Sequence, residues 1–333
     1  MNLRGQTARF LIGVLILTMA SFSFSSCGGS GIDLAGGGTS GTGVSTGAIS
    51  GFGSVVMNGV HYLTDSEVAP DFITHKFSHG MDNSSMTDRD LFRVGMVVTI
   101  HHGADDNNAE QIEYQDNLQG PIAAKNSGAD NTLTVLGQTV VVGDAVVFAS
   151  LNLNEIVQVS GFVDSAGRIR ATYIERNLQF HHHGGEIEVK GFVSGLSSSG
   201  FRLGPLPGGT GTTVTVSFAP AVGAGLADGM YVQVVTADPQ PVFGVITATR
   251  IDELSPRTVF PEESIVDLEG LVTASPSGSG NALSFAVEGK PVLTDNVTQY
   301  FGGTAANLQP DVRLQVQGTE NGGVLSAAKI IFR

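Results

Sequence analysis

The chain has 333 residues, with 17 Lys and Arg against 31 Asp and Glu, a single Cys and no Trp. Its formal net charge of −14 argues against nucleic-acid binding, which depends on Lys and Arg that neutralise phosphates. The same acidity argues against a polybasic membrane-binding surface. Because one Cys cannot form a disulfide within the chain, apolar burial and strand pairing must hold the fold together.

Residues 1–26 have the order of a secretory signal peptide. Arg4 and Arg9 precede an apolar stretch at 10–20, which is shorter than the roughly 20 residues that a membrane-spanning helix needs. Polar residues then lead to Cys27. This segment resembles the lipobox of bacterial lipoproteins, although Phe24 stands where Leu is usual.

The resemblance implies that Cys27 becomes the lipidated first residue of the mature chain. Gly28, rather than Asp, follows it, so we expect an exported lipoprotein of the cell envelope, anchored at the outer membrane. An ordinary secreted or periplasmic protein with an incidental Cys is the alternative. Residues 27–46 are rich in Gly, Ser and Thr, and this composition predicts a flexible tether between the lipid anchor and the folded part.

The rest of the chain repeats itself four times. Each unit opens with Gly-x-(Ile/Val)-small and closes with Ala-x-x-Ile, and openings and closings alternate strictly. The openings are 47–50, 120–123, 191–194 and 270–273, and the closings are 109–112, 171–174, 248–251 and 327–330. We therefore expect β domains at 47–116, 117–178, 189–255 and 266–333, with a His/Gly joint at 179–188 and a linker at 256–265.

Inside the units, Val, Ile and Thr alternate with polar residues, and 45 Gly and 12 Pro argue against long helices. A hairpin turn is expected at Asn58-Gly59, Leu136-Gly137 and Glu288-Gly289, and an expanded turn at 204–211 in the third unit. An alternating strand follows later in each unit, preceded by a Leu (Leu91, Leu153, Leu226 and Leu308).

About five strands per unit must close over one small core. The sequence thus predicts an all-β protein, a tandem array of four small five-stranded barrels of the OB or SH3-like kind. A flatter sandwich or a continuous β-solenoid is the rival architecture. Three features resemble DUF5666, a family of bacterial exported proteins of unknown function. They are the segment 51–62, the strand 94–98 and the Ala-x-x-Ile endings. The resemblance covers residues 46–333, is strongest in the first unit, and implies tandem lipoprotein domains without known catalytic residues.

Histidine is the residue type with the most uneven distribution, because all eight His lie between positions 61 and 183. Imidazole is a common ligand for Zn, Ni and Cu, so three groups are candidate metal ligands. The first group, 74–80, is expected in a long loop. A solvated polar linker and a pH-responsive joint are the alternatives for the tract before Gly184. The candidates are His75 with His79, His101 with His102, and His181, His182 and His183.

Other sites have weaker support. Acidic residues in loops lack the spacing of a calcium-binding loop and are expected to be solvated (Asp82, Asp88, Asp90, Asp105 and Asp106). No nucleophile or zinc-protease motif is present, and the single Cys is at the lipid site, so we expect no enzyme. Trp is absent and the Tyr share no repeat position, which weakens the case for a carbohydrate-binding module.

Two functions lead. The first is a non-enzymatic surface scaffold that presents loops to a protein or cell-surface partner. The second is the binding of a divalent transition metal through the His-rich first half. No other cofactor is expected.

Overall fold

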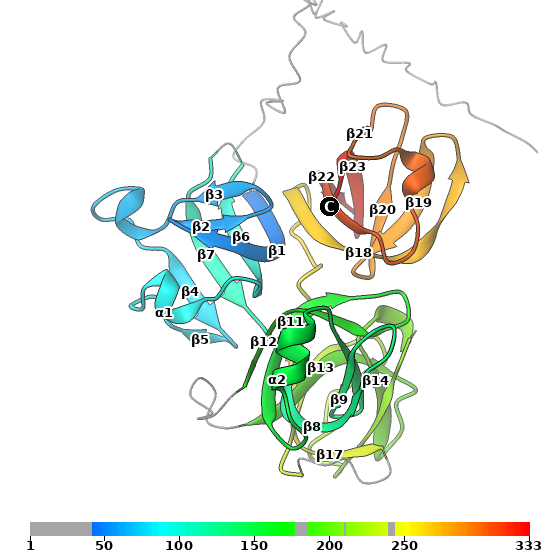
Figure 1. Cartoon of the computed structure of the whole chain (residues 1–333). Coiled ribbons are helices and arrows are strands. Elements are labelled where there is room, and N and C mark those ends of the chain that lie inside the picture. The colour runs from blue at the N-terminus through cyan, green and yellow to red at the C-terminus, as the bar shows by residue number, and fades with distance from the viewer. Residues whose placement is uncertain (1–41, 105, 177–185, 210, 239–243) are drawn as a thin grey trace, which may run out of the picture. The chain divides into compact units, whose positions relative to one another are not determined.

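The structure is a computed structural model that describes residues 42–104, 106–176, 186–209, 211–238 and 244–333 (Figure 1). Strands dominate these residues, and the expected all-β class is confirmed. Residues from Gly38 to Arg333 group as one compact unit. Among the described residues, no helix combines the length and the apolar character needed to cross a membrane.

Barrel 2 shows the architecture that all four units share. Its five strands close in the order β8–β9–β10–β12–β11–β8, with β10 and β12 parallel and the other pairs antiparallel. This is the closed, OB-like arrangement that the strand count predicted. The strands are β8 (Leu118–Asn126), β9 (Thr132–Val135), β10 (Gln138–Val142), β11 (Ile156–Val163) and β12 (Ile169–Arg176).

Barrels 3 and 4 repeat this order, and barrel 4 adds β21 beside its last strand. Barrel 3 contains β13 (Ile187–Ser194), β14 (Gly200–Gly204), β15 (Val214–Phe218), β16 (Tyr231–Thr236) and β17 (Val245–Leu254). Barrel 4 contains β18 (Ile265–Ser279), β19 (Ala282–Val287), β20 (Lys290–Leu293), β21 (Gln299–Phe301), β22 (Arg313–Asn321) and β23 (Val324–Phe332).

Barrel 1 is the most irregular unit. A bridge between Leu63 and Asn108 closes it beside β3, and an extra hairpin, β4–β5, adds to β7. The segment 74–80, expected as a loop, therefore contains a strand. The strands are β1 (Thr42–Phe52), β2 (Val55–Met57), β3 (Val60–Tyr62), β4 (His75–Ser78), β5 (Met81–Asp82), β6 (Val97–Gly103) and β7 (Ala109–Tyr114).

The hairpin turns explain why barrels 1, 2 and 4 open with Gly. Asn58-Gly59, Leu136-Gly137 and Glu288-Gly289 all have positive φ at both positions, as a type I′ turn requires, so these turns are confirmed. The side chain of the first turn residue folds back over the opening strand. A Cβ at Gly270 would lie 2.3 Å from Glu288 Cγ, so the close approach of that side chain demands Gly.

Short helices precede the fourth strand of several barrels. They are α1 (Asp88–Leu91), α2 (Ala145–Ser150) and the 3₁₀ turn η3 (Ala305–Asn307). Two further 3₁₀ turns lie earlier in their barrels, η1 (Asp65–Glu67) after β3 and η2 (Pro207–Gly209) after β14. Leu91 and Leu308, which precede the alternating strands of barrels 1 and 4, are buried. In barrel 2, Leu153 is exposed, and Leu151, at the end of α2, is buried instead.

The four barrels are not independent domains, because opening strands of different barrels pair with each other. β1 pairs in parallel with β18, and β8 pairs antiparallel with β13. We call these contacts the 1–4 seam and the 2–3 seam. β1 begins at Thr42, inside the segment expected to be a tether, because residues 43–46 pair with β18 and with β6.

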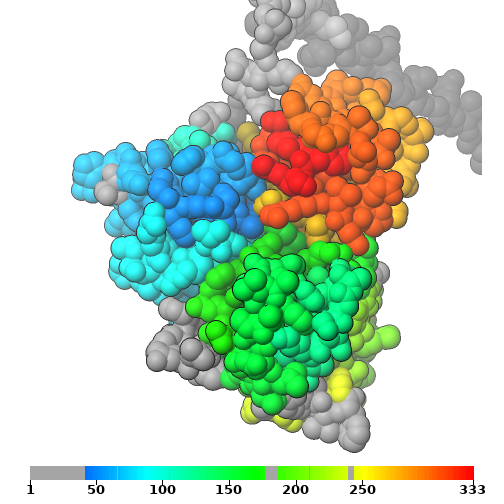
Figure 2. Space-filling view, in the orientation of Figure 1, coloured from blue at the N-terminus to red at the C-terminus, as the bar shows by residue number. Residues whose placement is uncertain are grey.

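The hydrophobic cores follow these seams. Barrels 2 and 3 share one continuous core, whereas barrels 1 and 4 each have their own. A small apolar cluster joins barrels 1, 2 and 4 through Ala48, Val97, Phe162 and Leu271. Figure 2 shows the same orientation as Figure 1 in space-filling form, with barrel 1 in blue and cyan and the end of barrel 4 in orange and red.

Candidate functional site

The polar residues that precede the opening glycines form the main candidate site. In a barrel strand, side chains alternate between the core and the outside, so the residues one and three positions before the Gly point outward. Because the opening strands form the seams, these outward side chains are buried between barrels. They are Thr46 in barrel 1, Asn117 and Gln119 in barrel 2, Glu188 and Lys190 in barrel 3, and Asp267 and Glu269 in barrel 4.

Lys190 lies at the centre of an ion cluster at the 2–3 seam. Its Nζ is 2.5 Å from Asp116 Oδ1 and 2.6 Å from Glu188 Oε1, and the side chains of Lys190 and Asp116 have no exposed surface. Asp116 comes from the segment between β7 and β8. Two carboxylates therefore bracket one ammonium group inside the protein.

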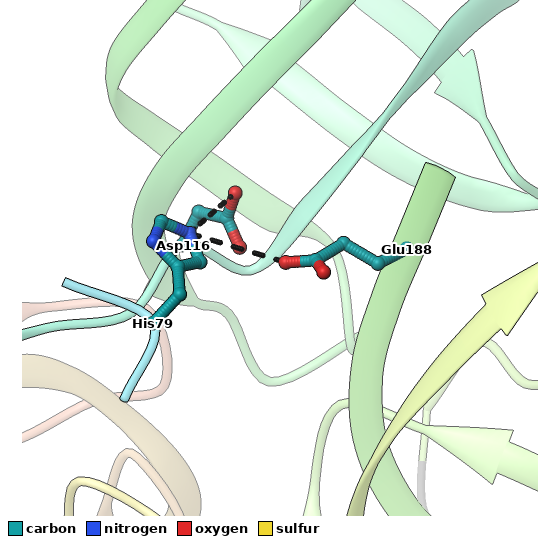
Figure 3. Close-up of side chains that lie close together, drawn as sticks. All are labelled: His79, Asp116 and Glu188. Carbon is teal, nitrogen blue, oxygen red and sulfur yellow. Dashed lines mark ion pairs between the residues drawn. The ribbon is translucent and has the colours of Figure 1, made fainter. Parts of the chain in front are cut away.

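His79 brings barrel 1 to this cluster (Figure 3). It follows β4, and its backbone N–H donates to the Tyr114 carbonyl at 2.9 Å. Its Nε2 lies 3.1 Å from Asp116 Oδ2 and 3.9 Å from Glu188 Oε1. The Tyr114 ring meets the imidazole edge-on, with centroids 5.3 Å apart. His79 of barrel 1 thus contacts Asp116, between barrels 1 and 2, and Glu188 of barrel 3.

Two amides complete the cluster. Gln158 Nε2 donates to Asp116 Oδ2 at 3.1 Å, and Gln233 Nε2 donates to Glu188 Oε2 at 2.8 Å. Each carboxylate therefore has a charged and an uncharged donor. Buried polar groups need such complete pairing, because an unpaired one costs about 1–3 kcal/mol.

The pKa shifts follow from burial and from the nearby charges. Burial alone would raise the pKa of Asp116, but Lys190 and His79 outweigh it and hold this pKa well below its usual range. Burial and the Asp116 charge raise the pKa of Glu188. Burial would lower the pKa of Lys190, but its two carboxylate partners raise it instead.

The cluster also has the residue types of a metal site. Ligand atoms of His79, Asp116 and Glu188 lie within 4.8 Å of one another, and they form the one such group among the described residues. However, the Lys190 ammonium already contacts both carboxylates and supplies the positive charge that a metal would bring. The geometry therefore fits a structural ion cluster that ties three segments together better than it fits a metal centre.

The 1–4 seam has a different chemistry. Asp267 accepts hydrogen bonds from Asn58 Nδ2 at 3.0 Å, from Gln315 Nε2 at 2.7 Å and from Gln317 Nε2 at 2.9 Å. Burial raises its pKa to about 6, against the hydrogen bonds from these amides. Glu269 accepts from the backbone N–H of Ala48 at 3.0 Å. Glu269 also forms an ion pair with Arg313 at 3.0 Å, whereas side-chain amides surround Asp267 in place of a Lys.

Glu288 joins barrel 4 to barrel 2. Its carboxylate accepts from the backbone N–H of Val163 at 3.1 Å and of Leu271 at 3.1 Å. Burial raises its pKa to about 7, although Arg257 and these N–H groups act in the opposite direction. A cavity with about 40 Å³ of free volume lies here between residues of all four barrels, large enough for a water molecule but not for a substrate.

The other histidines proposed as metal ligands lie apart from this cluster. His75 is exposed on β4, and His101 is half-buried on β6. His102 Nε2 lies 3.1 Å from Ser45 Oγ, and its Nδ1 lies 2.6 Å from the Gly103 carbonyl. His181, His182, His183 and the proposed lipidation residue Cys27 lie outside the described residues.

The acidic residues of barrel 1 have local partners. Asp82 accepts from the Ser84 N–H, and Asp90 from the Thr87 hydroxyl. Asp88 accepts from the Thr64 hydroxyl at 2.6 Å and lies 3.0 Å from Lys76 Nζ. Asp106 accepts from the Asn108 N–H, whereas Asp105 lies outside the described part.

Sequence reasoning missed Asp116, Glu188 and Lys190. A signal was present, because Glu188 and Lys190 alternate with apolar residues directly before the opening Gly191. Asp267 and Glu269 precede Gly270 in the same way. Charged residues on the outer face of a strand usually meet solvent. Only the pairing of opening strands across barrels turns this outer face into an interior.

Four closed barrels joined by their opening strands define a repeated β-barrel protein. The model of the domain of unknown function DUF5666 matches residues 119–175 and 269–331, which lie in barrels 2 and 4. Barrels 2 and 4 are thus similar to DUF5666 domains, and the predicted resemblance is confirmed. The sequence placed its strongest point in the first unit, whereas the match falls on the second and fourth.

Other comparisons add little. None of the curated proteins shows a significant match to the sequence. A solved structure of Drosophila Unr CSD456 aligns at 15% sequence identity over 60% of this chain and 89% of that chain, with a TM-score of 0.19.

Proposed function

We propose that this protein is a non-enzymatic scaffold of the cell envelope, anchored through a lipid on Cys27 and built to hold four β-barrels in a fixed array. The observation that carries this proposal is that the polar faces of the opening strands lie between barrels and not on an open surface. The polar side chains of the opening strands that could have lined a cleft, such as Glu188, Lys190 and Glu269, contact groups outside their own barrel instead. Their interactions support rigidity rather than substrate turnover.

The partner of such a scaffold would contact its loops and short helices. Val146 on α2 is 79% exposed and Val297 before β21 is 78% exposed, and neither side chain has a role in the barrel cores. Exposed apolar residues of this kind are common at protein-binding surfaces. The proposal therefore names a protein or cell-surface partner, no nucleic acid and no cofactor of catalysis.

Membrane anchoring is tested by fractionation of cells that produce the native chain or Cys27→Ala. The native protein should sediment with the outer membrane and should carry a radiolabelled fatty acid. The substituted protein should remain soluble or stay in the inner membrane without the label. A native chain that stays soluble, or a Cys27→Ala chain that is still labelled, would contradict the lipid anchor.

Partner binding is tested by site-specific photo-cross-linking in cells. A photoreactive residue replaces Val146, Val297 or, as the matched control, Thr247, which is exposed on the β17 strand face. We expect a discrete cross-linked species from one or both valine positions and none from Thr247. The scaffold proposal fails if none of the three positions gives a cross-link, or if all three give the same diffuse pattern.

A further inference from the structure

The outer face of barrel 1 brings together two histidines that are 26 positions apart in the sequence. β7 lies between β4 and β6, and the register pairs Gln111 with His75 on one side and with His101 on the other. The three residues form one row across three strands. Paired residues point to the same face of a sheet, so the row carries an imidazole on each side of Gln111.

The alternation of burial shows which face this is. Lys76 on β4, Ile112 on β7 and Ile100 on β6 are fully buried and point into the barrel. Their neighbours His75, Gln111 and His101 therefore point outward, where His75 is exposed and the other two are half-buried. Both imidazoles can reach solvent and a dissolved ion.

Glu113, which lies in the next row on the same face, places a carboxylate beside His101. Glu113 follows Gln111 on the same face of β7, and its Oε1 lies 3.7 Å from His101 Nε2. The Gln111 side-chain amide also donates to this carboxylate oxygen. Asp82 on β5 lies close enough to His75 to interact with it electrostatically. The face therefore combines two imidazoles with acidic groups.

The spacing of the row suits a shared ion. Neighbouring strands lie about 4.8 Å apart, so the Cα atoms of His75 and His101 are separated by about 10 Å. The ligand atoms of His75, His101 and Glu113 do not all lie within 4.8 Å of one another, so the His75 side chain must turn toward His101 over Gln111 to share an ion with it. A hollow of about 190 Å³ lies beside the row, lined by Phe77, Gly80, Gln111, Glu113, Tyr114 and Gln115. The buried Gln115 Oε1 has no hydrogen-bond partner among the described residues and could accept from a metal-bound water.

We propose that His75, His101 and Glu113 form a surface binding site for a divalent transition metal such as Zn²⁺, Ni²⁺ or Cu²⁺. Two imidazoles and a carboxylate are a common ligand set for these ions, and a water molecule completes the coordination. This site goes beyond the scaffold function, because it does not depend on the lipid anchor or on a protein partner.

Barrel 4 serves as an internal comparison. Its β21, β23 and β22 have the same arrangement as β4, β7 and β6, with Lys329 paired to Gln299 and to Gln317. Thr74 and Thr298 make matching hydrogen bonds, at 2.8 Å each, to the carbonyls of Ala109 and Ala327. The same backbone thus carries His, Gln and His in barrel 1 but Gln, Lys and Gln in barrel 4.

This comparison indicates that the histidines are not required by the fold. Ile331 takes the place of Glu113 in barrel 4, so the carboxylate is missing there as well. A barrel of this type is built without any of the three ligands. The set of ligands is therefore a property of barrel 1 that packing does not explain.

The buried His79 group is the competing metal site, and it differs in charge. Lys190 holds both of its carboxylates, so a metal would have to displace an ammonium group from inside the protein. No Lys or Arg makes an ion pair with Glu113 among the described residues. The outer row is therefore the better site for an ion.

The test is a titration of the untagged full-length protein in which His181, His182 and His183 are all replaced by Ala. This background removes the histidine tract, which could bind metal by itself. Zn²⁺ binding is measured by calorimetry, and Co²⁺ binding by its visible absorption, which reports the ligand geometry. His75→Gln and His101→Gln introduce the residues that barrel 4 has at these positions, and His61→Gln, an exposed His on β3, is the matched control.

We expect one metal ion per chain in the tract-free background. Loss of an outer-shell partner costs roughly 10–100-fold in metal affinity, so loss of either imidazole should weaken binding by at least about tenfold. The double variant should not bind, and His61→Gln should bind as before. Thermal unfolding of the apo double variant should match that of the parent, because both side chains lie on the outer face.

Two results would overturn the proposal. The first is no binding of either metal in the tract-free background. The second is binding whose affinity and absorption do not change in the double variant, which would move the site to His79 or His102.

Discussion

The two seams occupy the same place in the repeat but use different chemistry. At the 2–3 seam, Lys190 forms ion pairs with both Asp116 and Glu188 in a buried cluster. At the 1–4 seam, Asp267 faces three side-chain amides and has no Lys or Arg partner among the described residues. The same outward positions can therefore join two barrels through full charges or through amides.

This difference sets the response of each seam to a lost side chain and to pH. An ion cluster depends on the balance of its charges, so removal of one member leaves the others uncompensated. In the amide network, the Asp267 carboxyl group can take up a proton near pH 6, because burial raises its pKa to about 6. The first seam should be sensitive to substitution, and the second to pH.

The largest effect is expected from Lys190→Met. Met has a similar length but no charge, so Asp116 and Glu188 would remain buried without their shared cation. Breaking a buried ion pair in this way typically costs about 3–5 kcal/mol. We expect a loss of this size in the free energy of unfolding, measured by guanidinium denaturation at neutral pH.

The matched substitution at the other seam is Asp267→Asn. It removes the charge but keeps an oxygen that can accept from Asn58 or Gln315, and the amides can reorient. A loss of about 1 kcal/mol is expected, the cost of one net hydrogen bond. If Asp267→Asn costs as much as Lys190→Met, the two seams do not differ in the proposed way.

The second prediction concerns Glu288 and pH. Its pKa in the folded protein is about 7, above the ordinary 4.5, because the carboxyl group is buried. Between these values the native state retains a proton that the unfolded state has lost, so the native state binds more protons. The free energy of unfolding should therefore fall as pH rises from about 4.5 to 7, by about 3 kcal/mol for this group.

Glu288→Gln isolates this contribution because Gln does not titrate. Denaturation is measured at pH 5 and pH 7.5 for the native protein, for Glu288→Gln and for Glu253→Gln, which changes an exposed acid on β17. The drop in stability between the two pH values should be smaller in Glu288→Gln and unchanged in Glu253→Gln. An equal drop in all three proteins would rule out Glu288 as its source.

The fold was largely predictable because its rules are local. The turn at Glu288-Gly289 needs positive φ at both residues, and alternating strands must close once five of them share a small core. The seam was not predictable, since Lys190 meets Asp116 only after β8 and β13 pair. His79 reaches the cluster because the segment 75–78, expected as part of a loop, forms β4 beside β7.

The candidate ligands on the surface were partly predictable. Residue type alone singled out His75 and His101, because imidazoles gathered in one half of the chain suggest metal binding. Sequence proximity grouped His75 with His79 and His101 with His102, whereas strand register places His75 and His101 in one row. Residues two apart in a strand share a face and neighbours do not, so the register across β7 decides which imidazoles lie together.

The smallest effect is expected at an ion pair of good geometry that lies outside the seams. Arg250 binds both carboxylate oxygens of Glu186, at 2.6 and 2.5 Å, but its side chain is 47% exposed. Solvent screens such pairs, which contribute about 0–1 kcal/mol. Arg250→Ala should therefore lower the free energy of unfolding by less than about 1 kcal/mol, and less in high salt than in low salt. A loss as large as that of Lys190→Met would mean that contact geometry, and not burial between barrels, makes the Lys190 cluster important.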